Sequence, residues 1–302
     1  MKTHDRRHNR RGLKAKAVAI AAGALALTLG STLSASASGT GISGVADATS
    51  NSRTAFSSNA EKIWSFGIDG KDSAGNIWEY PPLQNGGFGS KKNAGSGFSS
   101  ANAMFKNNPG DTKNVVLYAR FGGTLKMYDD STSKTIGGGW NVYNAFVMPG
   151  NVGGASNPDL LARDTSGVLW EYLAYSGGTF TTRHKIGGGW NTYSQIAGRG
   201  DLTGDGKSDI VARDKSGVLW LYKGTGSTDA PYAARTKIGG GWNTYNKILG
   251  LGDSNGDGRA DLIARDGAGA LWLYPGTGKA ASPYLKRVRI GNSGWNAFSL
   301  LF

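Results

Sequence analysis

The stretch DIVARDKSGVLWLY, residues 209–222, decides the fold of this chain. Its two ends, DIVARD and VLWLY, are short runs of β-branched, aliphatic and aromatic residues, and KSG between them is typical of a turn. We therefore expect two antiparallel strands joined by a tight connection. The pattern returns as LLARDTSGVLWEY at 160–172 and as LIARDGAGALWLY at 262–274, which indicates an internal repeat.

Two landmarks trace this repeat through most of the chain. The LWLY-type strand ends at Tyr80, Tyr128, Tyr172, Tyr222 and Tyr274. A glycine–aromatic joint follows it each time, with the aromatic residue at Phe98, Trp140, Trp190, Trp242 and Trp295. Five copies in one fixed order predict five units, at roughly 60–101, 102–145, 146–195, 196–247 and 248–302.

Each unit contains enough strand-forming sequence for four short strands, and no segment of useful length has the apolar period of a helix. Four antiparallel strands in about 50 residues are typical of a propeller blade. We predict an all-β fold, a five-bladed β-propeller of four-stranded antiparallel blades; an open β-solenoid is the alternative. If the fourth strand of each unit belongs to the next blade, residues 296–302 close the ring by completing the blade that begins near Ile63.

The first 37 residues read as a secretory signal peptide. A basic leader precedes the apolar run AVAIAAGALALTLG and the small residues Ala35, Ser36 and Ala37. The apolar run is too short to span a bilayer, so we expect a secreted protein without membrane insertion after cleavage. Export through the Sec route is expected, and NRRGLK leaves the twin-arginine route open. Residues 38–59 are expected to form a flexible arm, or to add a strand.

Charge and composition exclude several functions. The leader holds 7 of the 34 Lys and Arg and 1 of the 21 Asp and Glu, so its removal lowers the net charge from +13 to +7. That charge is not the dense basic stripe of a nucleic-acid binder. The chain has no cysteine, and His184 is its one histidine outside the leader, which argues against nucleophilic hydrolases and histidine-ligated zinc sites. We expect no enzymatic activity.

Two acidic loops predict structural calcium sites. DLTGDGKSD at 201–209 and DSNGDGRAD at 253–261 place oxygen-bearing side chains at positions 1, 3, 5 and 9, with glycine at position 6. This spacing wraps a loop around a hard cation, and position 7 supplies a backbone carbonyl. The predicted Ca²⁺ ligands are Asp201, Thr203, Asp205, Lys207 and Asp209, then Asp253, Asn255, Asp257, Arg259 and Asp261. The equivalent NVGGASNPD at 151–159 keeps too few oxygens for an ion.

These loops and the strands after them carry a resemblance. GDLTGDGKSDIVARDKSGVLWLYKGTG and GDSNGDGRADLIARDGAGALWLYPGTG resemble FG-GAP (VCBS-type) repeats, which build integrin-like calcium-bearing propellers and many secreted bacterial propellers. The resemblance covers residues 150–302 and weakens through 60–149. It implies the propeller fold and structural calcium. GGGWNTY with LWLY is also similar to dispase autolysis-inducing protein-like propellers, which are exported and act on a metalloprotease.

The joints are the candidate ligand-binding positions. An indole offers a plane for stacking on a sugar, and the adjacent amide can bond hydroxyl groups. The pairs are Trp140 with Asn141, Trp190 with Asn191, Trp242 with Asn243, and Trp295 with Asn296. Packing between blades is the structural alternative for these tryptophans. We expect a monomeric extracellular binding module for a protein partner or a surface glycan; the alternatives are a multivalent lectin for cell-wall sugars and a modulator of a secreted protease.

Overall fold

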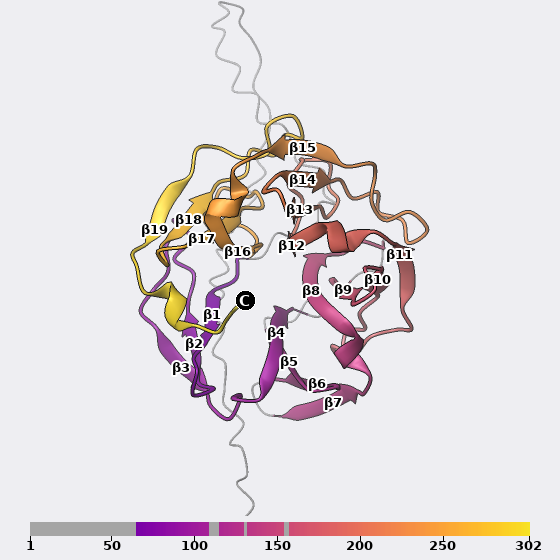
Figure 1. Cartoon of the computed structure of the whole chain (residues 1–302), viewed down its shortest axis with the longest axis vertical. Coiled ribbons are helices and arrows are strands. Elements are labelled where there is room, and N and C mark those ends of the chain that lie inside the picture. Colours follow the sequence, from indigo (N-terminus) through magenta and orange to yellow (C-terminus); the bar gives the residue numbers. More distant parts are fainter. Residues whose placement is uncertain (1–64, 109–114, 130–131, 154–156) are drawn as a thin grey trace, which may run out of the picture.

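A computed structural model describes residues 65–108, 115–129, 132–153 and 157–302. In these residues, five four-stranded antiparallel sheets stand around a common axis, and Figure 1 shows them as the blades of a closed ring. The prediction of a five-bladed β-propeller is confirmed, and the solenoid alternative is wrong. The signal peptide, the arm at 38–59 and the predicted start of the first unit lie outside the described residues.

In each blade the strands follow one another from the axis to the circumference. The first sheet contains β20 (Leu300–Leu301), β1 (Ile68–Lys71), β2 (Ile77–Tyr80) and β3 (Lys92–Gly95), and the second β4 (Ala101–Asn107), β5 (Val116–Phe121), β6 (Thr124–Tyr128) and β7 (Ser133–Gly137). The third contains β8 (Tyr143–Gly150), β9 (Asp159–Asp164), β10 (Leu169–Tyr172) and β11 (His184–Gly187). The fourth contains β12 (Tyr193–Ala197), β13 (Ile210–Asp214), β14 (Leu219–Tyr222) and β15 (Thr236–Gly239), and the fifth β16 (Tyr245–Leu249), β17 (Leu262–Asp266), β18 (Leu271–Tyr274) and β19 (Val288–Gly291).

The second strand of a blade is buried on both faces. Ile210, Val211 and Ala212 of β13 are at most 1% exposed, because neighbouring blades cover both sides of the sheet. This explains why DIVARD reads as a continuous apolar run and not as an alternating one. At its end, Asp214 N–H donates to Val218 O at 2.9 Å, and Gly217 supplies the positive φ of 83° that closes the turn into β14.

The last strand closes the ring. β20 pairs antiparallel with β1, so Gly70 lies opposite Leu301 and Lys71 opposite Leu300. Asp69 and Phe302 exchange two backbone hydrogen bonds of 2.9 and 3.0 Å. Figure 1 shows the C-terminus on the ring axis beside β1. Residues from the two ends of the described chain therefore complete one sheet, as the phase of the repeats predicts.

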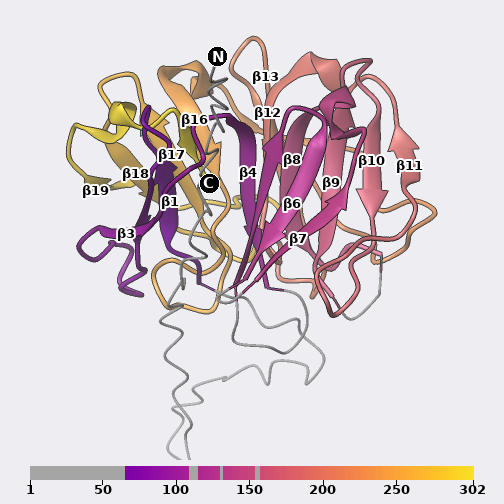
Figure 2. The ribbon, with the colours of Figure 1, turned by 90° about the horizontal axis from the view of Figure 1, so that it is seen from below.

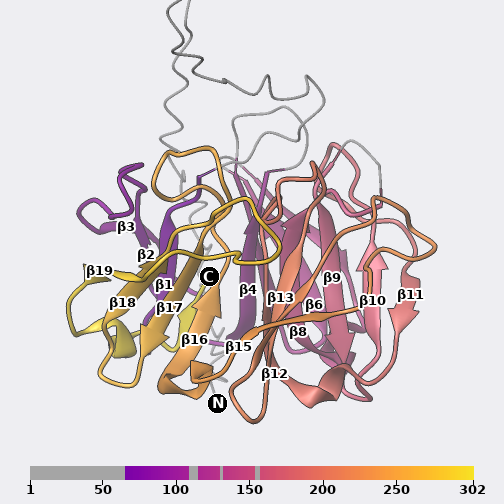
Figure 3. The ribbon, with the colours of Figure 1, turned by 90° about the horizontal axis from the view of Figure 1, so that it is seen from above.

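Alternating strand direction separates the connections onto two faces, and Figures 2 and 3 show the blades edge-on between them. The turns after the second strands and the glycine–aromatic joints share one face, which we call the joint face. The aspartate loops and the long loops between third and fourth strands of a sheet, such as 223–235, share the opposite face. Among the described residues, no helix has the length and apolar character needed to cross a membrane.

Candidate functional site

Three of the four joint tryptophans are buried. Trp140, Trp190 and Trp242 each begin a short 3-10 turn (Trp140–Val142, Trp190–Thr192, Trp242–Thr244) after a glycine with positive φ, and each is 7% exposed. The indole of Trp190 lies against Tyr222, with ring centroids 4.7 Å apart. Trp295, in the turn Trp295–Ala297, is partly exposed. The buried indoles pack between adjacent blades, as Trp242 does between Leu219 of the fourth sheet and Leu262 of the fifth. Packing between blades, the structural alternative, therefore accounts for these three tryptophans.

The asparagines that follow these tryptophans are exposed: Asn141, Asn191, Asn243 and Asn296. Asn191 Nδ2 donates to Thr165 O at 3.1 Å, and Asn296 Nδ2 donates to Gly267 O at 2.9 Å. Each of these two amides ties its joint to the strand-connecting turn beside it. In three of the four predicted Trp–Asn pairs, the tryptophan ring is therefore buried and the asparagine amide lies at the surface. Ligand binding by these residues stays a prediction.

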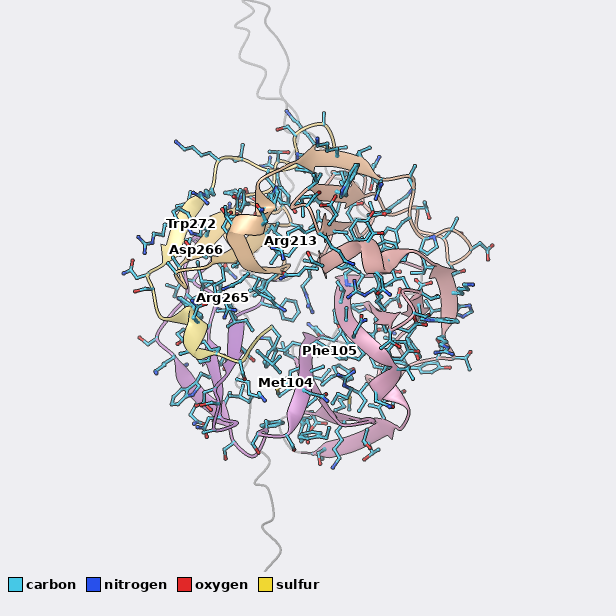
Figure 4. All side chains as sticks on the ribbon, in the orientation of Figure 1. Met104, Phe105, Arg213, Arg265, Asp266 and Trp272 are labelled. Carbon is cyan, nitrogen blue, oxygen red and sulfur yellow. The ribbon has the colours of Figure 1, made fainter. Side chains whose placement is uncertain are left out.

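The arginine of each RD pair holds the joint that follows. Arg213 Nη1 donates to Trp242 O at 3.0 Å and also to Tyr245 O, and Arg163 donates in the same way to Trp190 O and Tyr193 O. Burial lowers the pKa of the Arg213 guanidinium, whose hydrogen-bond partners here are uncharged oxygens. Arg120 and Arg265 repeat the arrangement in the second and fifth sheets. These arginines are structural clamps, and Figure 4 labels Arg213 and Arg265 in neighbouring blades.

The aspartate of each RD pair caps the adjacent turn. Asp214 Oδ1 accepts the Ser216 and Val218 N–H groups, and Oδ2 accepts Trp220 Nε1–H at 2.9 Å. Burial acts to raise the pKa of Asp214, but these hydrogen bonds prevail and lower it to about 2. Three further pairs repeat the contact with the tryptophan: Asp72 with Trp78, Asp164 with Trp170, and Asp266 with Trp272. Asp214 and its equivalents in the other sheets therefore have a structural role.

Position 9 of each aspartate loop is a structural brace. Asp209 Oδ2 accepts the Leu202 and Thr203 N–H groups at 3.0 and 2.9 Å, and Oδ1 accepts Gly224 N–H at 2.8 Å. Asp261 makes the same three contacts in the fifth sheet. Asp159 makes them too, although its loop lacks the other acidic positions. The side chain at this position therefore fixes the loop whether or not a cation is expected there.

The remaining loop positions fit calcium in part. Asp201 accepts N–H groups from Thr203, Gly204 and Gly206, which curls the loop around its carboxylate. Thr203 Oγ1 is buried and has no hydrogen-bond partner, which suits an oxygen that serves as a cation ligand. Asp205 lies 3.4 Å from Lys223 Nζ.

The second loop has the same form. Asp253 accepts N–H groups from Gly256, Asp257 and Gly258, Asn255 Oδ1 accepts Asp257 N–H, and Asp257 lies 3.5 Å from Arg259 Nη1. In the described part of the chain, no three Asp, Glu, His or Cys side chains converge on one point where they could hold a metal ion. Most of the carboxylate oxygens of the two loops are engaged with backbone amides or cationic side chains, whereas Thr203 Oγ1 is not, and calcium binding stays a prediction.

A repeated cation–tryptophan arrangement lies on the circumference. Arg183 lies 4.0 Å above the Trp170 ring, Arg235 4.1 Å above Trp220, and Arg287 4.0 Å above Trp272. Directly across from these tryptophans, on the outermost strands, are Lys185, Lys237 and Arg289. We call these three groups the rim clusters: Arg183–Trp170–Lys185, Arg235–Trp220–Lys237 and Arg287–Trp272–Arg289.

Tyrosines hold the stacked arginines in place. Arg183 Nη1 donates to Tyr143 Oη at 2.7 Å, and that hydroxyl is 2.6 Å from Tyr172 Oη. The fourth and fifth sheets repeat both contacts, with Tyr193 and Tyr222 around Arg235 and Tyr245 and Tyr274 around Arg287. Sequence reasoning missed these clusters. The available signal was the arginine two residues before Lys185, Lys237 and Arg289.

The axis of the ring is a narrow cavity of about 90 Å³ that side chains of all five sheets line. Most of the residues that line it are apolar, and Figure 4 shows Met104 and Phe105 on the inner strand of the second sheet. Lys247 is a cationic side chain in this wall, and burial, then the nearby Arg265, lower its pKa to about 8. The volume leaves room for little more than a few water molecules.

Comparisons with known proteins found a family model and distant solved structures. Residues 201–264 match the family model of the FG-GAP-like repeat. No curated protein matches the chain. Among solved structures, the BP39L lectin from Burkholderia pseudomallei is similar at 16% identity and a TM-score of 0.47, over 78% of this chain and 71% of the lectin chain. AofleA from Arthrobotrys oligospora is similar at 12% identity and a TM-score of 0.41, over 72% of this chain and 66% of its own.

At these identities neither similarity indicates a shared ligand. The family match covers both predicted calcium loops and the strands β13, β14, β15 and β16 between them. The match and the ring of five blades together identify the chain as a five-bladed β-propeller with FG-GAP-like repeat sequence at residues 201–264.

Proposed function

We propose that this protein is a secreted, non-enzymatic binding module that holds an extracellular glycan through the circumference of the propeller. The observation that carries the proposal is the threefold recurrence of the rim cluster, with an exposed arginine at nearly the same distance from its tryptophan each time. Identical exposed groups on one rigid ring favour a polymer with repeating units, because several weak contacts then act together.

The placement of the acids supports a non-enzymatic role. General acid–base catalysis and glycoside hydrolysis need carboxylates that are free to reach a substrate. In the described residues, the repeated aspartates cap turns or brace loops, and Asp69 forms a buried ion pair with Lys106 at 2.8 Å. These contacts favour a scaffold role for the acids over a reactive one.

Calcium belongs to the proposal as a stabilising ion. Asp201, Thr203, Asp205 and Asp209 would hold one ion with the Lys207 carbonyl, and Asp253, Asn255, Asp257 and Asp261 a second with the Arg259 carbonyl. The unpartnered, buried Thr203 Oγ1 supports the first site. A bound ion supplies positive charge among closely spaced carboxylates, and the loops supply oxygen ligands.

Binding of the mature protein to a panel of polysaccharides and isolated cell walls tests this function. We expect retention on at least one polysaccharide, and a matched pulldown from culture medium that recovers no stoichiometric protein partner. Retention on no glycan, together with one stoichiometric protein partner, would overturn the glycan assignment in favour of a protein-binding propeller.

A further inference from the structure

The rim clusters differ from an ordinary aromatic sugar site because an arginine covers one face of each indole. In each cluster, the guanidinium lies about 4 Å above the centroid of the tryptophan ring and therefore covers one face of that ring. A sugar ring needs such a face for stacking. What each cluster presents to solvent is therefore cationic: the remaining N–H donors of an arginine and the ammonium or guanidinium opposite the tryptophan.

The outermost strands extend this charge around the ring. β3, β7, β11, β15 and β19 carry Lys92, Lys134, Lys185, Lys237 and Arg289, and none of their residues is acidic. Three carboxylates contact the clusters, because Asp164, Asp214 and Asp266 each accept the indole N–H of a tryptophan. Each cluster therefore keeps one net positive charge at neutral pH.

Protection of exposed sheet edges does not account for the full arrangement. A lysine on an edge strand already prevents edge-to-edge pairing. Edge protection does not require an arginine that is stacked on a tryptophan and hydrogen-bonded to a tyrosine hydroxyl, as Arg183 is to Tyr143 at 2.7 Å. Stacking and anchoring fix the guanidinium before a ligand arrives, which reduces the entropy lost on binding. A fixed planar guanidinium suits bidentate contact with a carboxylate or phosphate.

We propose that the rim clusters bind a polysaccharide that carries anionic groups, carboxylates or phosphodiesters, and that one polymer contacts clusters on successive blades. This inference rests on the proposed function and names its ligand class. The clusters belong to the third, fourth and fifth sheets, which are neighbours in the ring, and Figure 1 places β11, β15 and β19 along one arc of its circumference. A nucleic acid fits less well because the arginine already occupies a face of each indole on which a base would stack.

The test measures binding of four polymers to the mature protein: polygalacturonate, its fully methyl-esterified form, polyribitol phosphate and duplex DNA. The ester keeps the sugar backbone and removes the charge. We expect polygalacturonate or polyribitol phosphate to bind about tenfold or more tightly than the ester, as charge-assisted hydrogen bonds predict. The affinity should fall steeply between about 50 and about 300 mM salt, because the contacts are exposed.

Substitutions then locate the contact. Arg235→Gln should weaken binding several-fold, and Arg235→Lys should restore only part of the loss because it keeps the charge without the planar fork. Lys215→Gln removes the same charge from an exposed turn on the joint face and should leave binding unchanged. A thermal melt of each variant confirms that the fold is intact.

The other outcomes are distinct. Equal binding of polygalacturonate and its ester would overturn the inference that the ligand is anionic. The proposed function of glycan binding would still stand. Equal loss in Arg235→Gln and Lys215→Gln overturns the rim clusters as the site. If DNA binds as tightly as the anionic polysaccharides, the inference that the polymer is a polysaccharide is overturned. If none of the four polymers binds but the protein is retained on another, neutral glycan, the inference of an anionic ligand is overturned and the proposed glycan binding is not.

Discussion

Glu171 is a single residue that conflicts with its surroundings. It is fully buried, and neither carboxylate oxygen has a hydrogen-bond partner. The equivalent positions of the next two sheets hold Leu221 and Leu273. Burial, reinforced by Asp159, raises the pKa of Glu171 to about 7. Because the folded state holds this proton more tightly than the unfolded chain, the associated stability is complete below about pH 4.5 and is lost as the pH rises through about 7.

Glu171→Leu should therefore stabilise the protein at alkaline pH. We expect a gain of about 3 kcal/mol in the free energy of unfolding at pH 8, and a much smaller difference at pH 4, where the glutamate is protonated. Urea unfolding across this pH range measures both values. Glu171→Gln keeps the shape and should remove the same pH dependence. A constant difference between wild type and Glu171→Leu at all pH values would contradict the assigned pKa.

Arg213 illustrates a residue whose role is structural despite its charge. Arg213→Gln removes the donor that serves Trp242 O and Tyr245 O and leaves buried carbonyls without a partner. We expect a loss of about 2 kcal/mol or more in the free energy of unfolding. Lys215→Gln, two residues along the chain and exposed, is the matched control and should change stability by less than about 0.5 kcal/mol. Similar small effects in both variants would show that the clamp contributes little.

At the scale of elements, the aspartate loops connect the first and second strands of the fourth and fifth sheets. If they bind calcium, a chelator should lower the melting temperature, and added Ca²⁺ should restore it more effectively than Mg²⁺. Asp205→Asn and Asp257→Asn should each remove part of this response. Asn151→Ala, in the loop where no ion is expected, should leave it unchanged. A melting temperature independent of chelator would contradict structural calcium.

The elements also show how far sequence reasoning extends. The recurrence of LWLY and GGGW predicted the number of blades and the pairing of the last strand, because each repeat has the same local pattern. The same recurrence could not tell whether Trp190 faces a ligand or Tyr222, since both uses require one aromatic residue per blade. Asp209 was predicted as an ion ligand from its spacing, but its bond to Gly224 joins the loop before β13 to the loop after β14, which spacing alone does not reveal.

For the whole molecule, closure of the ring depends on seven C-terminal residues. Removal of 296–302 deletes the strand that pairs with β1 and the buried side chains of Leu301 and Phe302. We expect this truncation to abolish cooperative thermal unfolding. Leu301→Asp keeps the chain length, places a charge in the buried strand and should destabilise strongly, whereas Asn292→Asp, an exposed change nearby, should have little effect. A truncated protein that stayed folded and monomeric would contradict the proposed closure.

The most direct test of the account is binding by a series with one, two and three rim clusters disabled. Arg183→Gln, Arg235→Gln and Arg287→Gln are combined stepwise, and the affinity of each folded variant for the best-bound polysaccharide is measured. If the clusters act together on one polymer, each further substitution should multiply the loss, and the triple variant should bind about a hundredfold or more weakly. A triple variant that binds the polysaccharide as tightly as wild type would contradict the assignment of binding to the circumference of the propeller.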